Sequence, residues 1–252
     1  MPVQKECPIL SVERLNADAI SIWLECGGLA KAAAVGQFVN IKCGEALLLR
    51  RPISICRVED TRLNVVFEVR GEGTAWLAAR SAGETLDVLG PLGHGFTYPE
   101  GKVLVVGGGI GVPPMLNTAL RAPAGAIACL GFRSAERAML VEEFQRACEQ
   151  VYLASDDGTL GVHGFVADIV DAALTEHPEV AAVLACGPRI MLKTTYDVCR
   201  RHGVACQVSM EERMGCGIGA CLVCACKSAD GAYRHVCKDG PVFAAEEVCW
   251  DA

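Results

Sequence analysis

Apolar residues recur at every second position through much of the first hundred residues. Ile20, Ile22 and Leu24 occupy alternate positions of one run, and the run 63–69 repeats the pattern. A period of two is typical of half-buried β-strands. Gly and Pro residues interrupt these runs often, so the strands are expected to be short and joined by turns. The pattern predicts a small antiparallel β-barrel over residues 1–100.

The pattern changes from about residue 102 onward. Continuous apolar runs now alternate with helix-like stretches, at 103–106, 113–121, 126–130, 135–149, 151–154, 165–174, 180–185 and 191–202. Buried strands that alternate with helices predict an α/β domain with a parallel sheet and helices on both faces, over residues 101–208. The remaining residues, 209–252, are too few to fold easily alone, so a metal centre would help them fold.

The composition narrows the class of protein further. A chain of 252 residues is long enough for two ordinary domains and a small appendage. The net charge of −7 argues against a nucleic-acid partner, because phosphate binding normally needs a basic patch. No apolar run reaches the roughly 18 residues of a membrane-spanning helix, and the N-terminus lacks the apolar core of a signal peptide. We therefore expect a soluble cytoplasmic protein with no membrane partner.

The number of cysteines is high for such a protein. The chain has fifteen, and no secretion signal accompanies them. Disulfides are rare in a reducing cytosol, where clustered cysteines more often bind metal. We expect a structural role for Cys249, which lies close to the end of the sequence. The singly placed cysteines are interpreted as small buried apolar side chains: Cys7, Cys26, Cys43, Cys56, Cys129, Cys148, Cys199 and Cys206.

Four cysteines near the C-terminus have the spacing of a cluster site. Cys216-x4-Cys221-x2-Cys224, followed by a distant Cys237, is the plant-type ferredoxin spacing for a 2Fe–2S cluster. Small residues around Cys216 suit a backbone that wraps a cluster and directs N–H groups at sulfur. Four cysteines also bind zinc, although zinc ribbons usually show two short cysteine pairs. A Rieske centre would need histidine ligands, and His235 has no matching second Cys-x-x-His.

Cys226 competes with Cys237 for the role of fourth ligand. It lies two residues after Cys224, and alternate residues of a strand face the same side. Asp230-Gly231 is a strong signal for a two-residue hairpin turn. Strands paired about that turn place Cys224 opposite Cys237, with Cβ atoms about 5 Å apart. The same register sets Cys226 opposite His235, so it favours Cys237 as the ligand.

Two segments of the barrel indicate a flavin. Arg51-Pro52-Ile53-Ser54 alone would fit a solvated turn, but Val69-Arg70-Gly71-Glu72-Gly73-Thr74 follows downstream. The glycines there allow close backbone approach, while Arg70 and Thr74 offer phosphate donors. Together the segments resemble the FAD-binding barrel of the ferredoxin–NAD(P) reductase superfamily. The resemblance implies FAD contacts from Arg51, Pro52, Ile53, Ser54, Glu68, Val69, Arg70, Gly73 and Thr74.

A glycine loop follows the apolar run 103–106. It places backbone N–H groups and a helix N-terminus where a pyrophosphate could bind, through Gly107, Gly109, Gly111 and Pro113. Pro114 replaces the third glycine of a dehydrogenase fingerprint, which again resembles the reductase superfamily; a tight turn without ligand is the alternative.

Two later strand ends complete the predicted nucleotide site. In the superfamily a Cys-Gly-Pro turn lies beside the nicotinamide, which points to Cys186 and Gly187; a packing cysteine is the alternative. Asp156 ends a third strand and is a candidate nucleotide contact, although acidic turns are usually solvated. Arg133 and Ser134 follow the second strand, and either could contact a 2′-phosphate, so the choice between NAD and NADP stays open.

The order of barrel, nucleotide domain and cysteine-rich tail resembles the electron-transfer subunits of B-type, NAD-dependent dihydroorotate dehydrogenases. The resemblance covers essentially the whole chain and is most specific at 214–221 and 235–243. Val223 departs from it, because a small residue is expected there.

The resemblance implies a relay in pyrimidine biosynthesis. A partner subunit would oxidise dihydroorotate on FMN, and electrons would pass through the 2Fe–2S cluster and FAD of this chain to NAD. The family implies a heterotetramer of two catalytic and two electron-transfer subunits. Two alternatives stay open: a similar reductase subunit serving a hydrogenase, sulfide dehydrogenase or oxygenase, and a non-catalytic zinc-binding scaffold.

Overall fold

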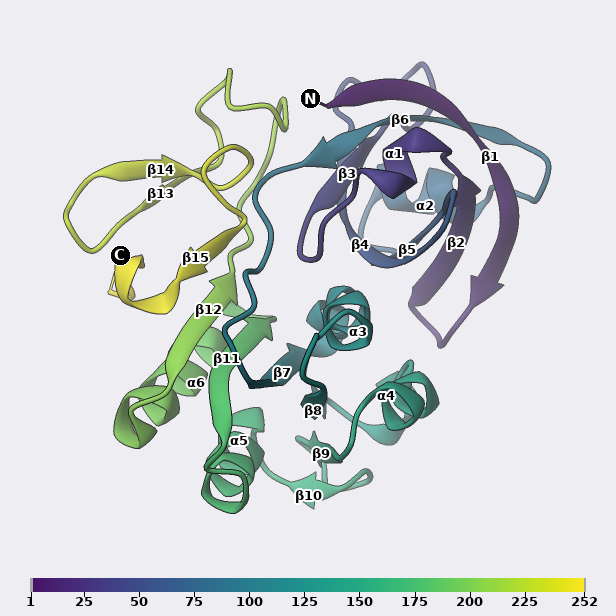
Figure 1. The fold of residues 1–252 in the computed structure, drawn as a ribbon. Helices are drawn as coiled ribbons and strands as arrows, with labels where there is room; N and C mark the ends of the chain where they lie inside the picture. Colours follow the sequence, from purple (N-terminus) through teal and green to yellow (C-terminus); the bar gives the residue numbers. More distant parts are fainter. Residues whose placement is uncertain (1, 252) are drawn as a thin grey trace.

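The computed structural model describes residues 2–251. Its N-terminal part is a closed barrel in the order β1-β2-β5-β4-β3-β6, with antiparallel neighbours throughout (Figure 1). The strands are β1 (Val3–Arg14), β2 (Ala19–Glu25), β3 (Phe38–Ile41), β4 (Arg51–Glu59), β5 (Arg62–Glu68) and β6 (Thr85–Leu92). Two short helices, α1 (Gly28–Lys31) and α2 (Glu72–Ala78), lie in the connections. The predicted barrel is confirmed.

The barrel closes around side chains that alternate inward along its strands. Ile22 and Leu24 of β2 and Val39 and Ile41 of β3 are fully buried in one apolar core. Asn40, between two of these residues, therefore points away from the barrel interior.

The second part of the chain is a seven-stranded sheet in the order β10-β9-β8-β7-β11-β12-β15. Its strands are β7 (Lys102–Gly108), β8 (Ala126–Phe132), β9 (Val151–Ser155), β10 (Val162–His163), β11 (Val180–Cys186), β12 (Ala205–Ser209) and β15 (Val242–Ala244). All neighbouring pairs are parallel except β12 with β15. The predicted parallel sheet is thus confirmed, and the tail of the chain adds an antiparallel edge strand to it.

Helices cover both faces of this sheet, as predicted (Figure 1). Residues of α3 and α4 pack with Val103 and Val105 of β7, while residues of α5 and α6 pack with Leu104 and Val106. The helices are α3 (Val112–Leu120), α4 (Val141–Ala147), α5 (Val166–Glu176) and α6 (Arg189–His202).

The single helix predicted over 135–149 is divided. A short 3-10 turn, η2 (Ala135–Arg137), precedes α4, and Leu140 between them has a φ of 59°. A left-handed leucine ends regular helical geometry, so α4 starts only after it.

The tail carries a short hairpin, β13 (Ala225–Lys227) with β14 (Tyr233–His235), before β15 joins the large sheet. Two 3-10 turns, η1 (Gly109–Gly111) and η3 (Ala245–Glu247), complete the elements. The domain boundaries at residues 100 and 208 stay predictions. Within residues 2–251, no helix is both long and apolar enough to cross a membrane.

Candidate cluster and nucleotide sites

The four predicted cluster cysteines meet at the end of the molecule where the tail touches the barrel. Cys216 and Cys221 lie in the loop after β12, Cys224 directly precedes β13, and Cys237 lies two residues after the end of β14. The sulfurs of Cys224 and Cys237 are 3.2 Å apart. The side chains of Cys216 and Cys221 also interact, and the backbone N–H of Cys216 lies 3.4 Å from the sulfur of Cys221. The thiols therefore form two neighbouring pairs, as two iron atoms with two cysteine ligands each would require.

Backbone N–H groups donate to all four sulfurs. Cys216 accepts from Ile218 and Ala220 at 3.4 and 3.3 Å. Cys237 accepts from Gly219 at 3.1 Å, and Cys224 accepts from the N–H of Cys237 at 3.5 Å. Such donors stabilise negative charge on sulfur, which is the form that binds iron. The loop can turn its N–H groups inward because Gly217 and Gly219 have φ of 76° and 81°.

The thiols differ in their readiness to ionise. Burial raises the pKa of Cys216, but the N–H groups of Ile218, Cys221 and Ala220 outweigh that effect and lower it to about 6. Burial, together with the neighbouring Cys224 thiol, raises the pKa of Cys237 to about 12. A bound metal deprotonates such thiols. The site therefore fits a cluster with a cationic iron–sulfur core. Backbone N–H groups already favour the thiolate of Cys216, whereas the thiol of Cys237 needs a bound metal in order to ionise.

The predicted register of the cysteine hairpin is wrong by one residue. Ala225 pairs with His235 and Cys226 with Arg234. The turn is longer than two residues because the Asp230 carboxylate accepts the N–H of Ala232 at 2.9 Å, and Ser228 N–H bonds to the Ala232 carbonyl at 2.9 Å. A three-residue loop with left-handed Gly231 results, φ 85°.

Cys224 and Cys237 come together for a different reason than the predicted cross-strand pairing. After β14 the chain turns sharply, and Asp239 N–H bonds to the carbonyl of His235 at 2.7 Å. This turn carries Cys237 back over Cys224. Cys226 packs beside Phe243 and Val248 in the apolar core, and burial raises the pKa of its thiol.

The two predicted flavin segments lie against each other although residues 55–68 separate them in the sequence. A Cβ atom on Gly73 would come within 2.1 Å of Arg51 Nε, so the guanidinium rests directly on the first turn of α2. Thr74 Oγ1 accepts the backbone N–H of Arg70 at 2.9 Å and that of Gly71 at 3.2 Å. The segments therefore form one cradle, in which only glycine leaves room for the arginine.

The side chains of the other predicted flavin residues in β4 do not all point the same way. Pro52 and Ser54 alternate with Ile53, whose side chain is buried in the barrel core. Any contact from Ile53 to a flavin would therefore come from its backbone. Arg70 forms an ion pair with Glu68 at 2.6 Å beside the cradle, and Val69 lies between them with an exposed side chain.

The glycine loop and the Cys-Gly-Pro turn form one edge of the sheet. Gly107 pairs with Cys186, and a Cβ on Gly111 would come within 2.3 Å of the Cys186 carbonyl oxygen. Gly109 begins η1, and Pro113 lies in the first turn of α3. Gly187 is less constrained than Gly111, because its Cβ would lie 2.5 Å from Met191 Cε, the movable end of a side chain. These residues lie at the carboxyl ends of parallel strands, where nucleotides bind in α/β sheets.

Two further predicted residues, Cys186 and Asp156, lie at this edge. Burial raises the pKa of the Cys186 thiol to about 12, although a hydrogen bond with Ser209 opposes the rise. The side chain therefore stays a neutral thiol near neutral pH. Asp156 follows β9, and its N–H bonds to the Phe132 carbonyl at the end of β8, which places it at the same edge.

Sequence reasoning missed one residue at the junction of barrel and tail. Asn40 Nδ2 donates to the carbonyl of Cys216 at 3.2 Å, and the asparagine is only 1% exposed. Its signal in the sequence was a single amide within the apolar run Phe38–Ile41. The pattern alone could not show what this amide touches.

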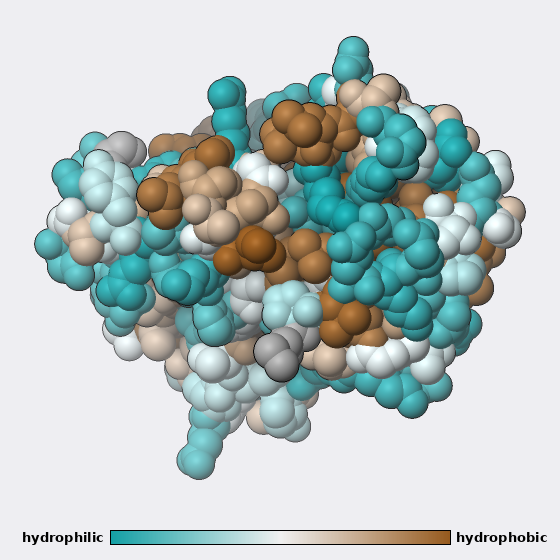
Figure 2. All heavy atoms as spheres, turned by 90° about the horizontal axis from the view of Figure 1, so that it is seen from above, coloured by the Kyte–Doolittle hydropathy of each residue, from teal (hydrophilic) through white to brown (hydrophobic). Residues whose placement is uncertain are grey.

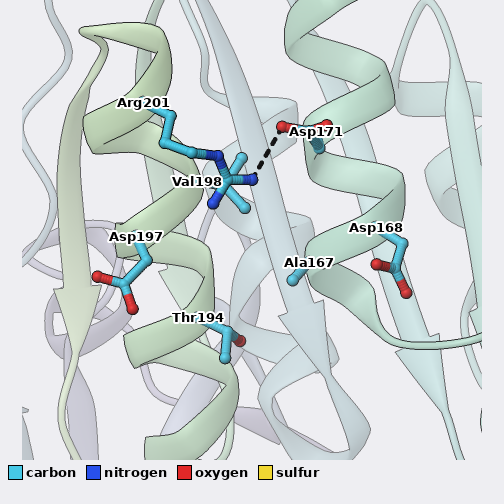
Figure 3. A pocket seen from close by; sticks show the side chains of 7 residues that line it. All are labelled: Ala167, Asp168, Asp171, Thr194, Asp197, Val198 and Arg201. Carbon is cyan, nitrogen blue, oxygen red and sulfur yellow. Dashed lines mark hydrogen bonds and ion pairs between the residues drawn. The ribbon is translucent and has the colours of Figure 1, made fainter.

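A surface groove lies between α5 and α6, away from these sites (Figure 3). Arg201 of α6 and Asp171 of α5, which both line the groove, form an ion pair at 3.1 Å. The groove is lined by Ala167, Asp168, Asp171, Thr194, Asp197, Val198 and Arg201. None of the predicted site residues, all of which lie within 2–251, is among them.

Comparison with known proteins agrees with this architecture. Residues 211–249 match the iron–sulfur cluster binding domain of dihydroorotate dehydrogenase B. The electron transfer subunit of dihydroorotate dehydrogenase B (NAD(+)) from Caldanaerobacter subterraneus subsp. tengcongensis is 40% identical, over 95% of this chain and 96% of its own length. The same subunit from Geobacillus thermodenitrificans is 41% identical, over 84% and 86%.

The fold agrees equally well with a solved structure. A chain of the NADH-dependent reduced ferredoxin–NADP oxidoreductase superposes with a TM-score of 0.88 and 30% identity, over 97% of this chain and 90% of that one. Fold and cysteine site thus define an oxidoreductase subunit of the ferredoxin reductase class with a C-terminal iron–sulfur domain. Within that class, the chain belongs to the family of electron transfer subunits of dihydroorotate dehydrogenase B. The predicted resemblance is therefore confirmed, and membership decides against a zinc scaffold.

Proposed function

We propose that this chain carries electrons from a catalytic subunit that oxidises dihydroorotate, through a 2Fe–2S cluster and FAD, to NAD. The observation that carries the proposal is the set of backbone N–H groups directed at four paired cysteine sulfurs, on a loop that contacts the barrel through Asn40. Such a site is built for a charged cluster and lies next to the predicted flavin strand. We further propose a division of the chain at residues 100 and 208 into flavin, nucleotide and cluster domains.

Cys216, Cys221, Cys224 and Cys237 would hold the cluster. The loop that carries Cys216 and Cys221 packs through Gly219 against Lys238, the residue that follows Cys237. When bound, the flavin exchanges single electrons with the cluster and a hydride with NAD. Arg51 and the first turn of α2 would hold its phosphates, because the guanidinium, a strong phosphate donor, rests on that turn.

The nucleotide would bind along the edge formed by Gly107, Gly109, Gly111 and Gly187. Gly111 packs on the Cys186 carbonyl and Gly187 on Met191, and nothing lies within 4 Å of a Cβ at Gly109, so the backbone there is accessible to a pyrophosphate. Cys186 would present a neutral thiol at the nicotinamide, which adds no charge beside the ring that accepts hydride.

The catalytic partner would dock over the cluster end of the molecule. Ile218, Leu222 and Val223 are each more than half exposed there, and Leu48 in the loop after β3 is 97% exposed. Figure 2 looks down on this end and shows apolar atoms gathered in the middle of the face between hydrophilic regions. Exposed apolar clusters of this kind mark protein interfaces. Val223 would then contribute to docking, which explains why a large side chain is accepted beside the cluster.

We propose that the partner carries FMN and that two copies of each subunit assemble. A cytoplasmic location is proposed as well, because all fifteen cysteines, which lie within residues 2–251, are free thiols. Such a chain suits a reducing compartment.

The test uses the full chain loaded with iron, sulfide and FAD. The chain alone should oxidise NADH with an artificial acceptor such as ferricyanide and should leave dihydroorotate unchanged. Added catalytic subunit should enable orotate-dependent oxidation, in which NADH, a proton and orotate yield NAD and dihydroorotate. Turnover of dihydroorotate by the single chain would contradict the division of labour. NADH oxidation without orotate dependence in the complex would point to another electron partner.

A further inference from the structure

Asn40 is a buried amide that belongs to the barrel but bonds to the cluster loop. Its neighbours Val39 and Ile41 point into the barrel core, so its side chain leaves the outer face of β3. There Nδ2 donates to the carbonyl of Cys216 at 3.2 Å. This hydrogen bond joins segments 176 residues apart in the sequence and reaches a cluster ligand itself.

The cluster loop packs closely against the Asn40 side chain. A Cβ on Gly217 would come within 2.6 Å of Asn40 Nδ2, so the loop approaches the amide as nearly as glycine permits. Among the described residues, Asn40 Oδ1 has no hydrogen-bond partner although it is buried. Buried polar atoms in native proteins are nearly always paired. An apolar residue would fill this place without that cost, so packing alone does not account for an asparagine here.

The backbone of Asn40 is held on both sides. It pairs with Pro52 of β4 and with Leu89 of β6, and its carbonyl accepts from Arg50 Nη1 at 3.3 Å. Arg50 in turn forms a partly buried ion pair with Asp87 at 2.6 Å. The amide is therefore a fixed point of the barrel and not a mobile contact.

Asn40 also lies beside the predicted flavin strand. Its paired neighbour Pro52 shares the outer face with Ser54, and paired residues of neighbouring strands have Cβ atoms about 5 Å apart. One strand spacing thus separates a hydrogen bond to the cluster ligand Cys216 from the residues assigned to FAD.

We propose that Asn40 is a positioning residue for electron transfer, which holds the Cys216 peptide against the strand pair that carries the flavin. This inference rests on the proposed function. In the step concerned, one electron moves between flavin and cluster, one group is oxidised as the other is reduced, and no bond is formed or broken. The rate of such a step falls steeply with the separation of the two groups, so a loop that is free to shift slows it.

The test uses the full chain with bound FAD and cluster, and NADH as the reductant. Asn40→Leu keeps the branched shape and the number of heavy atoms of the asparagine side chain but removes the donor. In stopped-flow absorbance we expect flavin reduction by NADH at the original rate, and the following reduction of the cluster about tenfold slower, because small displacements of reacting groups are costly. The electron paramagnetic resonance spectrum of the dithionite-reduced cluster should also change, since the Cys216 peptide is no longer fixed.

Asn64→Leu is the matched control. Asn64 is a second buried asparagine of the barrel, bonded through Nδ2 to Ser21 at 2.8 Å and to the Ile22 carbonyl at 3.1 Å. Its loss should lower the melting temperature while the cluster spectrum and the rate of cluster reduction stay unchanged. For Asn40→Leu we expect a changed cluster spectrum and slower cluster reduction, while the melting temperature should fall less than in Asn64→Leu, because the substitution also removes the unpaired Oδ1.

Asn40→Asp is a second variant, to be used if Asn40→Leu does not retain its iron. This variant keeps the shape and polarity of the side chain and places negative charge near the cluster. It should slow cluster reduction and lower the reduction potential of the cluster, because the reduced cluster carries more negative charge. An unchanged rate and an unchanged spectrum in both variants would overturn the proposal. Absence of FAD or iron from the unsubstituted chain would instead overturn the proposed function.

Discussion

Two glycine-rich loops of this protein present backbone N–H groups, and their glycines are needed for different reasons. In the nucleotide loop the reasons are divided between residues: a Cβ on Gly111 would meet the Cys186 carbonyl at 2.3 Å and one on Gly108 would meet Met191 Sδ at 2.3 Å, whereas Gly109 has open space but a φ of 53°. In the cluster loop Gly217 and Gly219 combine both reasons, since each has positive φ and a Cβ would come within 2.6 Å of Asn40 Nδ2 or Lys238 Cδ.

The two loops also differ in what holds them. The nucleotide loop connects a fully buried strand, β7, to α3, so sheet and helix shape it without any ligand. The cluster loop exposes Ile218 and Leu222, and its sulfurs accept most of the hydrogen bonds that organise it. The difference indicates that a phosphate site can be built in advance by packing, whereas the cluster site depends on its metal.

The largest expected effect is the loss of a cluster ligand. Cys237→Ser should abolish cluster binding, because the serine hydroxyl is a poor replacement for a thiolate that pairs with Cys224. Iron content and visible absorbance measure the loss. Cys226→Ser is the matched control, two residues from Cys224 but in the apolar core, and it should retain the cluster. If Cys226→Ser loses iron and Cys237→Ser keeps it, the ligand set is wrong.

The next largest effect is a difference between the two loops in amide hydrogen exchange when the cluster is removed. After anaerobic chelation of iron, we expect amide hydrogen exchange to accelerate by at least about tenfold in residues 215–224 and 233–240. Exchange in β7 and α3 should hardly change, because their hydrogen bonds do not involve the cluster. Equal acceleration in both regions would contradict the idea that packing alone shapes the nucleotide loop.

A smaller effect is expected from glycine substitution in the nucleotide loop. Gly111→Ala should weaken NAD(H) binding about tenfold or more, because overpacking against Cys186 costs about 1–3 kcal/mol. Gly109→Ala meets no atom within 4 Å, although its φ of 53° adds backbone strain, so it should be milder. The Michaelis constant for NADH with ferricyanide measures both. Equal effects would show that conformation, and not contact, sets the need for glycine here.

The smallest effect concerns the thiol at the nucleotide edge. Because burial raises the pKa of Cys186 to about 12, its thiolate fraction is minute at neutral pH and grows about tenfold per pH unit below that value. Alkylation of Cys186 in the holo protein should therefore be slow near neutral pH and rise with pH without a plateau. Mass spectrometry of the modified peptide gives the rate. A plateau near pH 8 would mean that a neighbouring positive charge ionises the thiol.

The fold could be predicted from the sequence in most of its parts. Alternation in β2 and β5 indicated the barrel, and the apolar runs that became β7 and β8 indicated the parallel sheet. The helix predicted over 135–149 failed because Leu140 takes a left-handed conformation, which no local pattern signals. The edge strand β15 was not expected, since three residues carry too little periodicity to identify a strand.

At the sites, the chemistry could be predicted from local patterns: the meaning of the cysteine spacing, the glycine loop and the two flavin segments depends only on residue type and distance along the chain. The contacts between these segments could not be predicted, because they arise on folding. The Asp230 side chain shifted the hairpin register by one residue, a turn after His235 brought Cys237 to Cys224, and Arg51 came to rest on Gly73. Asn40 met Cys216 across 176 residues for the same reason. Such pairings depend on side-chain contacts between distant segments, and these do not exist until the barrel and the sheet have formed.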